Sequence, residues 1–436
     1  MDPIFLGMLG LCAMFALIAL HVPIAIAMGL TGFVTVGLML GWGPAAAVIK
    51  SEASAMMSHR DLGVIPLFLL MGSFATAAGL SRDLYRLAYA LVGHYPGGLA
   101  MSTIGGCAGF GAICGSSVAT AATMTRVALP EMLERGYRPS LATGCIAAGG
   151  TLGMLIPPSV IMVLYGVLTE QFIIALFVAA ILPGLLAVAL HFIAIFITVR
   201  ISPESGPAGE RMAWSERASA LRDSWRVIAL AGLVSGGIYG GIFTVVEAAS
   251  VGTCLAFLFL IMRGGLRWAV LRHVLTETAA NTGLIYMIII GAHIFAYFIS
   301  LSHMADFLVE TFQSLGLHPL LLITLIYVMY LILGSVFDTV AAMVITLPFV
   351  FPVVISLGYD PIWFGVISVM IIEIGMITPP IGINVFVLHG MAPGIPLGTI
   401  FRGITPFLIA DLTRVAILTA FPAIALWLPK AMGIPM

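Results

Sequence analysis

The stretch GTLGMLIPPSVIMVLYG, residues 150–166, sets two adjacent prolines inside a long apolar segment. A second stretch, EIGMITPPIGINVFVLHG at residues 373–390, repeats the pattern. Proline has no N–H and its ring clashes with the carbonyl four residues back, so each pair interrupts a helix and frees backbone carbonyls. In lipid an orphaned carbonyl is costly, so broken backbone is expected only against protein or a water-filled cavity. The two stretches therefore predict two specialised interruptions in membrane helices.

The composition is that of a membrane protein with many spans. Of the 436 residues, 61% are hydrophobic and 8% are charged, whereas soluble domains carry about 25% charged residues. The formal net charge of −1 gives no basis for nucleic-acid binding. The five cysteines form no CxxC pair, which argues against a disulfide or zinc framework. We expect an all-α polytopic membrane protein that lies in a lipid bilayer.

Apolar runs near the length of a membrane span, about 20 residues, recur along the chain. They lie at roughly 4–20, 22–41, 61–80, 97–113, 140–169, 171–199, 226–243, 245–262, 279–300, 318–333, 361–390 and 398–428. Two further pieces, about 112–130 and 334–356, are rich in small and hydroxylated residues, and each contains a Leu-Pro pair. We expect these two pieces to be re-entrant helical hairpins. The sequence thus predicts about 11–12 transmembrane helices plus two hairpins.

The two halves of the chain repeat each other. A Gly-Tyr-x-Pro motif begins at Gly136 and again at Gly358, and a Pro-Pro pair begins at Pro157 and again at Pro379. The offset from Gly136 to Gly358 equals the offset from Pro157 to Pro379, and we call it the repeat offset. Interrupted hydrophobic segments at matching positions of two halves are the best sequence indication of a secondary transporter's binding site.

The repeat defines the domain organisation. Residues 1–200 form the first repeat, 201–225 a polar linker and 226–436 the second repeat. The predicted broken helices cover about 140–169 and 361–390. An inverted repeat needs an odd number of crossings per half, whereas hydropathy gives six. Either one run in each half lies flat, with the amphipathic segments 43–60 and 263–278 as horizontal arms, or the count of runs is wrong.

Oxygen-bearing side chains precede each break at matching places. GSSVATAATM, residues 115–124, precedes the first break, and GSVFDTVAAM, residues 334–343, precedes the second. Hard cations prefer oxygen ligands, and the C-terminal end of a half-helix adds favourable partial charge. We expect each stretch to be a hairpin tip that faces its own broken helix, where a sodium ion satisfies hydroxyls, a carboxylate and the freed carbonyls together.

Four polar groups near the breaks have alternative interpretations. A carboxylate within a membrane is a functional-site hypothesis by default, so Asp338 is expected to couple sodium or protons, with a helix cap in an exposed loop as the alternative. The Ser116-Ser117 pair fits ion ligation or a plain helix N-cap. Glu373 is expected to be a structural hydrogen bonder or a coupling group, and Asn384 to reach the substrate.

Other polar residues in apolar segments have structural interpretations. Asp411 and Arg414 are spaced i, i+3 and are expected to neutralise each other. His191 and His293 have no ligand partners at metal spacing and are expected to be packed histidines.

Four motifs together resemble the large membrane subunit of tripartite ATP-independent periplasmic (TRAP) transporters. The similarity covers almost the whole chain. The motifs are HYPGGLA (94–100), GSSVATAATM (115–124), GYRPSLATGCIAAGGTLGMLIPPS (136–159) and GGIFTVVEAAS (240–250).

The resemblance implies an elevator-type transporter with an inverted repeat like that of the ion transporter superfamily, in which a transport domain moves against a scaffold domain. It implies a sodium-coupled importer of an organic acid, sialic acid or a C4-dicarboxylate, in the bacterial inner (cytoplasmic) membrane. Expected partners are a small four-helix membrane subunit on a separate chain and a periplasmic substrate-binding protein. Sodium is the expected coupling ion, and no organic cofactor is expected. The absence of a Walker A motif agrees with transport that ATP does not drive.

The family's sites can be transferred to matching positions of this chain. The first implied sodium site uses Ser116, Ser117 and Thr120 of the hairpin with Gly153, Ile156 and Pro157 of the break. The second uses Asp338 and Thr339 with Gly375, Met376 and Thr378. Substrate is expected between the hairpin tips, near Ser159 and Asn384.

Two other functions remain as alternatives. An ion or solute channel would need a continuous pore, whereas paired broken helices favour alternating access. An intramembrane aspartyl protease could use Asp360, after Tyr359, with Asp338, but the chain lacks the Gly-x-Gly-Asp partner motif and the repeat would have no role.

Overall fold

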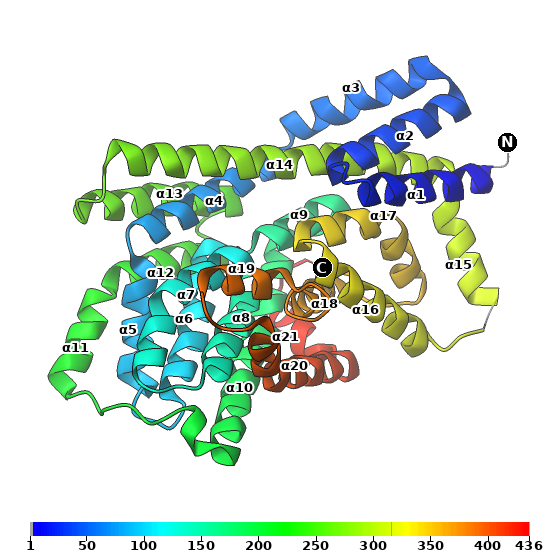
Figure 1. Cartoon of the computed structure of the whole chain (residues 1–436). Helices are drawn as coiled ribbons and strands as arrows, with labels where there is room; N and C mark the ends of the chain where they lie inside the picture. The colour runs from blue at the N-terminus through cyan, green and yellow to red at the C-terminus, as the bar shows by residue number, and fades with distance from the viewer. Residues whose placement is uncertain (1–2, 315, 436) are drawn as a thin grey trace.

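The computed structural model describes residues 3–314 and 316–435, and all regular elements in that part are helices (Figure 1). The first half contains α1 (Pro3–Ala19), α2 (Ile24–Leu40), α3 (Trp42–Ser58), η1 (Arg60–Gly63), α4 (Val64–Ala77), α5 (Leu80–Val92), α6 (Gly98–Cys114), α7 (Ser117–Glu134), α8 (Pro139–Leu155), α9 (Val160–Thr169) and α10 (Ile173–Ile201). The linker contains η2 (Pro203–Ser205) and α11 (Trp214–Asp223). The second half contains α12 (Trp225–Tyr239), α13 (Val245–Met262), α14 (Trp268–Leu301), α15 (Met304–Ser314), α16 (Pro319–Val336), α17 (Thr339–Ser356), α18 (Pro361–Gly375), α19 (Ile383–Met391), α20 (Leu397–Ala420) and α21 (Ala423–Ala431).

The chain is an all-α polytopic membrane protein. Within the described residues, seven helices are long and apolar enough to cross a membrane, or eight if the bent pair α8–α9 counts as one span. Five more apolar helices, α1, α2, α6, α12 and α18, are shorter. The structure has fewer long helices than the spans predicted from the sequence, because breaks and turns divide several apolar runs into shorter helices. A helix of 17 residues, such as α6, is about 25 Å long, near the lower limit for a span.

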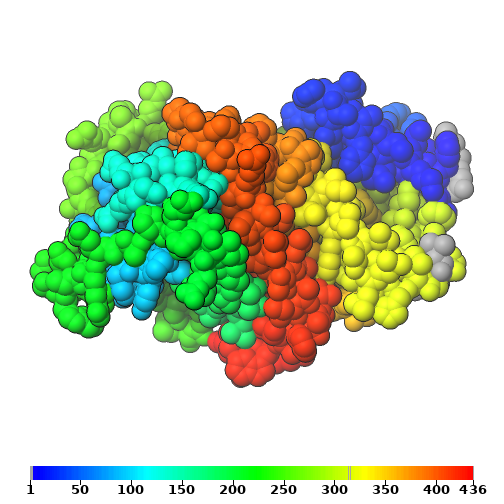
Figure 2. Space-filling view, turned by 60° about the horizontal axis from the view of Figure 1, so that its bottom comes forward, coloured from blue at the N-terminus to red at the C-terminus, as the bar shows by residue number. Residues whose placement is uncertain are grey.

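The helices pack in two groups. In one, α2 packs along α14, and α4 packs against α13 and α14. In the other, α8 packs against α6, α7 and α20, while α18 packs against α16 and α17. Figure 1 shows α1–α3, α13 and α14 along one side of the molecule. Figure 2 shows the C-terminal segments, orange to red, crossing the middle of one face between first-half segments and the yellow second-half segments.

Glycine allows the central helices of the second group to approach closely. A Cβ at Gly403 in α20 would lie 1.9 Å from the Ser140 carbonyl oxygen in α8, and one at Gly144 would lie 2.1 Å from the Gly403 oxygen. Small residues let membrane helices bring their backbones close together. In lipid the hydrophobic effect does not drive helices together, so van der Waals contact between close backbones stabilises their packing. The Gly- and Ala-rich sequence of α8 therefore places the first break deep inside the packed group.

The hairpins differ from the prediction. The segments predicted as whole hairpins, 112–130 and 334–356, consist mainly of the second arms, α7 and α17. The first arms are α6 and α16, which the sequence assigned to separate spans at 97–113 and 318–333. The prolines at 130 and 348 lie inside continuous helices. The turns fall instead at Gly115, whose φ of +61° ends α6, and at the extended Phe337.

The predicted arms also differ from each other. Helix α3 is separate from α4, but the second arm runs unbroken into the next helix as the 34-residue α14. Pro66 favours the first break, because proline is best tolerated in the first turn of a helix and α4 starts at Val64. Residues 268–301 contain no proline, so α14 continues.

The polar linker is anchored to the base of the first hairpin. The backbone N–H of Gly97 donates to the Gly206 oxygen at 2.9 Å, and that of Arg138 donates to the Ser205 oxygen at 3.1 Å. The side chains of Arg138 and Glu204 form an ion pair. The base of hairpin α6–α7 and the linker therefore lie on the same side of the molecule.

Candidate functional site

The first break and the tip of hairpin α6–α7 lie against each other. Ser116 caps α7, and its Oγ accepts from the Ala119 N–H at 3.3 Å. The Thr120 hydroxyl donates to the Ser116 oxygen at 2.7 Å. A Cβ at Gly153 would lie 2.6 Å from Thr120 Oγ1 and 3.0 Å from the Ser116 oxygen. Only glycine fits without displacing these oxygens, so Ser116, Thr120 and Gly153 come together as expected for an oxygen-lined site.

The two prolines remove the N–H donors of two α8 carbonyls, and one of these two gains no other donor among the described residues. In a continuous helix, residues 157 and 158 would donate to Gly153 and Met154, but both are prolines. The Ser159 hydroxyl donates to the Met154 oxygen instead. No described group donates to the Gly153 oxygen. This oxygen lies at the C-terminal end of a half-helix, where the helix dipole favours a cation.

The second break lies against the tip of hairpin α16–α17. Asp338 caps α17, and its Oδ1 accepts from the Ala341 N–H at 2.7 Å. The Asp338 residue is exposed, and its Oδ2 has no partner among the described residues. The Gly382 N–H donates to the Ser335 oxygen at 3.0 Å and joins the break to the tip. Asp338 is thus both a cap and a carboxylate with a free oxygen.

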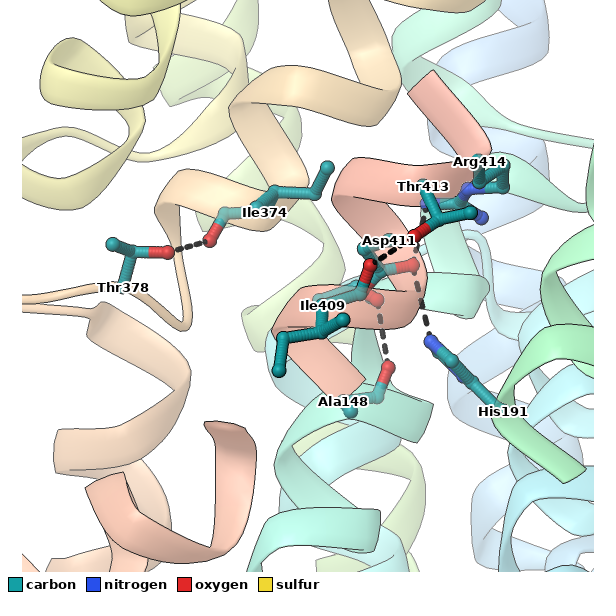
Figure 3. Close-up of polar contacts among 9 residues, drawn as sticks. Ala148, His191, Ile374, Thr378, Ile409, Asp411, Thr413 and Arg414 are labelled. Carbon is teal, nitrogen blue, oxygen red and sulfur yellow. Dashed lines mark hydrogen bonds and ion pairs between the residues drawn. The ribbon is translucent and has the colours of Figure 1, made fainter. Parts of the chain in front are cut away.

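In the second break, the two carbonyls that the prolines would leave without donors accept from other N–H groups. The Gly375 oxygen accepts from the Thr378 N–H at 2.8 Å, and the Met376 oxygen accepts from the Asn384 N–H at 3.1 Å. The Thr378 hydroxyl donates to the Ile374 oxygen at 2.6 Å (Figure 3). Gly375 packs on the first arm of the hairpin, because a Cβ there would lie 2.7 Å from the Leu331 oxygen. In the described part of the chain, no hydrogen bond joins Asp338 to Gly375, Met376 or Thr378.

The Met376 side chain joins the two halves. Its sulfur lies 3.9 Å from the Ser117 hydroxyl and 2.9 Å from that of Thr339. Ser117 and Thr339 occupy equivalent positions of the two hairpins, separated by the repeat offset. Asn384 Nδ2 donates to Ser117 Oγ at 2.7 Å, and all three of these polar side chains are at most 1% exposed. The tip of the first hairpin is therefore bonded to the broken helix of the second repeat.

Glu373 is a member of this cluster that the inferred sodium-ligand set omits. Its carboxylate is 1% exposed, and Oε1 accepts from the Thr339 hydroxyl at 2.6 Å. Glu373 Oε2 and Asn384 Oδ1 are both buried without a hydrogen-bond partner in the described part of the chain. The sequence signal that marks Glu373 as unusual is its position in an apolar segment, shortly before the second Pro-Pro pair.

The remaining predicted site residues lie in the first break, where Pro157 and Ser159 are buried and Ile156 is partly exposed. Ser159 is fully buried, with its hydroxyl committed to the Met154 carbonyl. Ile156 is the extended residue that ends α8, and its N–H donates to the Leu152 oxygen. Pro157 follows in the break itself. The structure does not bring Ser159 and Asn384 together around an open cavity, so their assignment to substrate stays a prediction.

A second buried cluster joins the last long helices of the two repeats. Asp411 Oδ1 in α20 accepts from Arg414 at 2.9 Å and lies 3.0 Å from His191 Nε2 in α10. All three side chains are almost completely buried, and Figure 3 shows His191 and Arg414 approaching Asp411 from different directions. The expected Asp411–Arg414 pair forms. His191 is packed, as expected, but it also contacts a carboxylate of the other repeat, a contact that spacing alone could not show.

One polar cavity opens beside the first tip. Its volume is about 590 Å³, and it lies between hairpin α6–α7 and helices α4 and α14. Ser116 and Arg126 line it from the hairpin, and Thr76, Glu277 and Asn281 line it from the facing helices. The cavity is large enough for a small organic acid.

Comparison with known proteins gives consistent results. The sequence model of the family described as "Tripartite ATP-independent periplasmic transporter, DctM component" matches residues 11–424. A C4-dicarboxylate TRAP transporter large permease protein DctM of Pseudomonas aeruginosa is 36% identical over 408 residues, covering 93% of this chain and 94% of the relative. A sialic acid TRAP transporter large permease protein SiaM of Vibrio cholerae is 31% identical over 387 residues, covering 88% and 90%.

Among solved structures, the Alcanivorax borkumensis YdaH transporter matches with a TM-score of 0.63. The match covers 90% of this chain and 89% of that one at 17% identity. This likeness concerns the fold alone.

Proposed function

We propose that this chain, which belongs to the DctM component family of tripartite ATP-independent periplasmic transporters, imports an organic acid together with sodium ions. The observation that carries the proposal is the donor-free carbonyl of Gly153, a residue that packs tightly against Thr120 and the Ser116 oxygen at the first hairpin tip. Oxygen ligands at the end of a half-helix are the usual way in which secondary transporters bind a coupling cation.

Membership of this transporter family has two consequences. The chain is a membrane transporter and not an enzyme, so the aspartyl protease alternative is wrong. The channel is then the one remaining alternative, and membership of a transporter family argues against it.

Two sodium sites follow from the two breaks. In the first, the Gly153 carbonyl, the Ser116 carbonyl and the Thr120 hydroxyl would hold the ion, with Ser117, Ile156 and Pro157 around them. In the second, Asp338 would supply the charge, with Thr339, Gly375, Met376 and Thr378 around it. Binding of sodium at both tips would fix the hairpins against their broken helices, which is the arrangement that a substrate would bind. No organic cofactor is required for this coupling.

An elevator motion would carry the substrate across the membrane. We propose that the group containing the hairpins and broken helices is the transport domain, and that α2, α4, α13 and α14 belong to the scaffold. The turn that connects α4 to α5 contains Gly79, which has a φ of +71°. The corresponding turn α14–α15 contains His303 with a φ of +53°. These turns join the two groups and would serve as hinges.

Substrate and partners follow from the family. Relatives are named for transport of C4-dicarboxylate and of sialic acid, so we propose an organic acid of one of these types as substrate. A periplasmic binding protein would deliver it, and a small four-helix membrane subunit would complete the transporter in the bacterial inner membrane. Ser159 and Asn384 are proposed to meet the substrate after the tips separate.

Uptake into proteoliposomes tests this proposal. The chain would be reconstituted with its small subunit, and an inward sodium gradient would be applied with labelled succinate or N-acetylneuraminate. We expect accumulation above the external concentration, dependent on the added binding protein. Equilibration without accumulation would identify a channel. Robust accumulation without the binding protein would identify an ordinary secondary carrier.

A further inference from the structure

The cavity beside the first tip has walls from both helix groups. Ser73 and Thr76 come from α4, and His273, Glu277 and Asn281 come from α14. The opposite wall comes from hairpin α6–α7 and includes Ser116 at its tip. The cavity therefore begins where the first ion site is proposed and extends along α7.

Arg126 is the cationic side chain of this cavity. It is the only lysine or arginine among the described residues that line the cavity. It is exposed and forms no ion pair or hydrogen bond in the part of the chain that the structure describes. Because α7 rises about 1.5 Å per residue, Arg126 lies roughly 15 Å from Ser116 toward the base of the hairpin. Arg126 thus lies between the hairpin tip and the side of the protein that carries the linker.

The acidic group in the cavity does not neutralise Arg126. Glu277 lies in α14 and is paired with His273 at 3.6 Å, one turn away on the same helix. No described ion pair joins Glu277 to Arg126. A free guanidinium between low-dielectric walls raises the local concentration of anions, and its planar donors match a carboxylate.

The corresponding cavity in the second half has no such group among the described residues. That cavity, about 370 Å³, lies between α14 and hairpin α16–α17. The repeat offset takes Arg126 to Pro348, which lines this cavity together with Val344, Leu347 and Phe351. Its ionisable lining residues, Glu52 and His293, face each other at 3.1 Å. Of these two cavities, only the one beside the first hairpin therefore has a free cationic side chain among the described residues that line it.

We propose that Arg126 is an anion-binding residue that holds a substrate carboxylate on its route between the first hairpin tip and the linker side of the protein. This inference rests on the proposed function, because it assigns a carboxylate substrate to the cavity. Arg126 would bind the substrate outside the two sodium sites and contribute to its affinity without contributing to sodium binding.

Substrate binding by purified complexes of the large and small subunits tests the inference. Thermal unfolding would be followed at rising concentrations of succinate and N-acetylneuraminate in sodium. We expect Arg126→Gln to weaken the apparent affinity for the transported acid roughly three- to tenfold, a modest loss because the guanidinium is exposed. Arg126→Lys keeps the charge but loses the planar pair of donors, so it should lose less affinity than Arg126→Gln. The stabilisation by sodium alone should be the same in all variants.

Arg402→Gln is the matched control, since Arg402 is exposed on α20 and does not line the cavity. Wild-type affinity in Arg126→Gln would overturn the inference. The inference would also be overturned if Glu277→Gln lost as much affinity for the acid as Arg126→Gln, and if the exchanged pair, Arg126→Glu with Glu277→Arg, restored that affinity. Arg126 would then pair with Glu277 and not with substrate. Failure of the wild type to take up either acid with sodium would instead contradict the proposed function.

Discussion

The two broken helices share a Pro-Pro pair and a place in the repeat, but their backbones are completed differently. In the first break, the prolines leave the Gly153 carbonyl without a donor among the described groups. In the second, the Gly375 and Met376 carbonyls accept from the N–H groups of Thr378 and Asn384. The first break spans four residues between α8 and α9, and the second spans seven between α18 and α19, so its longer loop can fold back on itself.

The two hairpin tips also differ, in the charge of the residue that caps the second arm. Ser116 and Asp338 occupy equivalent positions of the repeat, and both are N-caps that accept from the N–H three residues on. The first tip is neutral, while the second carries a carboxylate and lies near the buried Glu373. A repeated motif therefore does not imply repeated ligands. The proposed first site would depend on backbone and hydroxyl oxygens, and the proposed second site would depend on charge.

The largest expected effect comes from a Cβ at the second break. Gly375→Ala would place a methyl group 2.7–2.8 Å from backbone atoms of Leu331 and Gly334, which cannot move without shifting α16. We expect destabilisation of about 3 kcal/mol or more and loss of folded protein. Gly153→Ala approaches a movable hydroxyl first, so it should keep the fold but lose sodium-driven uptake. Yield, thermal unfolding and uptake together separate the two results, and equal yields would contradict the difference in packing.

The next effect separates charge from capping. Asp338→Asn keeps a good N-cap, so thermal stability should change by less than about 0.5 kcal/mol. Removing the carboxylate should lower sodium-driven uptake at least about 100-fold if it is the charged ligand. Ser116→Ala, the matched change, should retain most uptake because its site uses the Ser116 backbone carbonyl. Near-wild-type uptake in Asp338→Asn would remove the second ion site.

A smaller effect distinguishes the two threonines. Thr120→Val removes a proposed ligand, and we expect the half-saturating sodium concentration for uptake to rise about tenfold. Thr339→Val removes the hydroxyl that donates to the buried Glu373 carboxylate. It should therefore lower thermal stability by about 1–3 kcal/mol in addition to affecting uptake. If Thr120→Val leaves the sodium dependence unchanged, the first site is assigned incorrectly.

The smallest effect concerns the two Gly-Tyr-x-Pro turns. Asp360 caps α18 by accepting from the N–H groups of Ile362 and Trp363, so Asp360→Ala should cost about 1 kcal/mol of unfolding free energy. Arg138, at the matching position, has an exposed ion pair with Glu204, so Arg138→Ala should cost less than about 0.5 kcal/mol. Chemical denaturation in detergent measures both. A larger loss in Arg138→Ala would mean that the linker contact supports the fold.

Parts of this architecture could be predicted from the sequence because they are local. The Pro-Pro pairs located the breaks, since two adjacent prolines remove two successive N–H donors, whereas single prolines such as Pro130 and Pro348 lie inside continuous helices. The Ser116 and Asp338 stretches located the tips, since capping residues and glycine act on adjacent backbone. The first hairpin arms were not recognised, because α6 and α16 have the length and hydropathy of a spanning helix.

Contacts between the halves could not be predicted from periodicity. The Asn384–Ser117 bond and the His191–Asp411 contact each join residues of different repeats. Packing of whole helices decides such pairs, and a single sequence contains no local signal for them. For the same reason Glu373 could be recognised as unusual, but its Thr339 partner could not be.

Sodium dependence of uptake tests the central claim most directly. Reconstituted transporter with its binding protein would be assayed as sodium replaces potassium at constant ionic strength. Two sodium sites of different chemistry predict no uptake in potassium alone and a sodium dependence steeper than hyperbolic. Uptake that is equal in potassium and sodium would contradict the account.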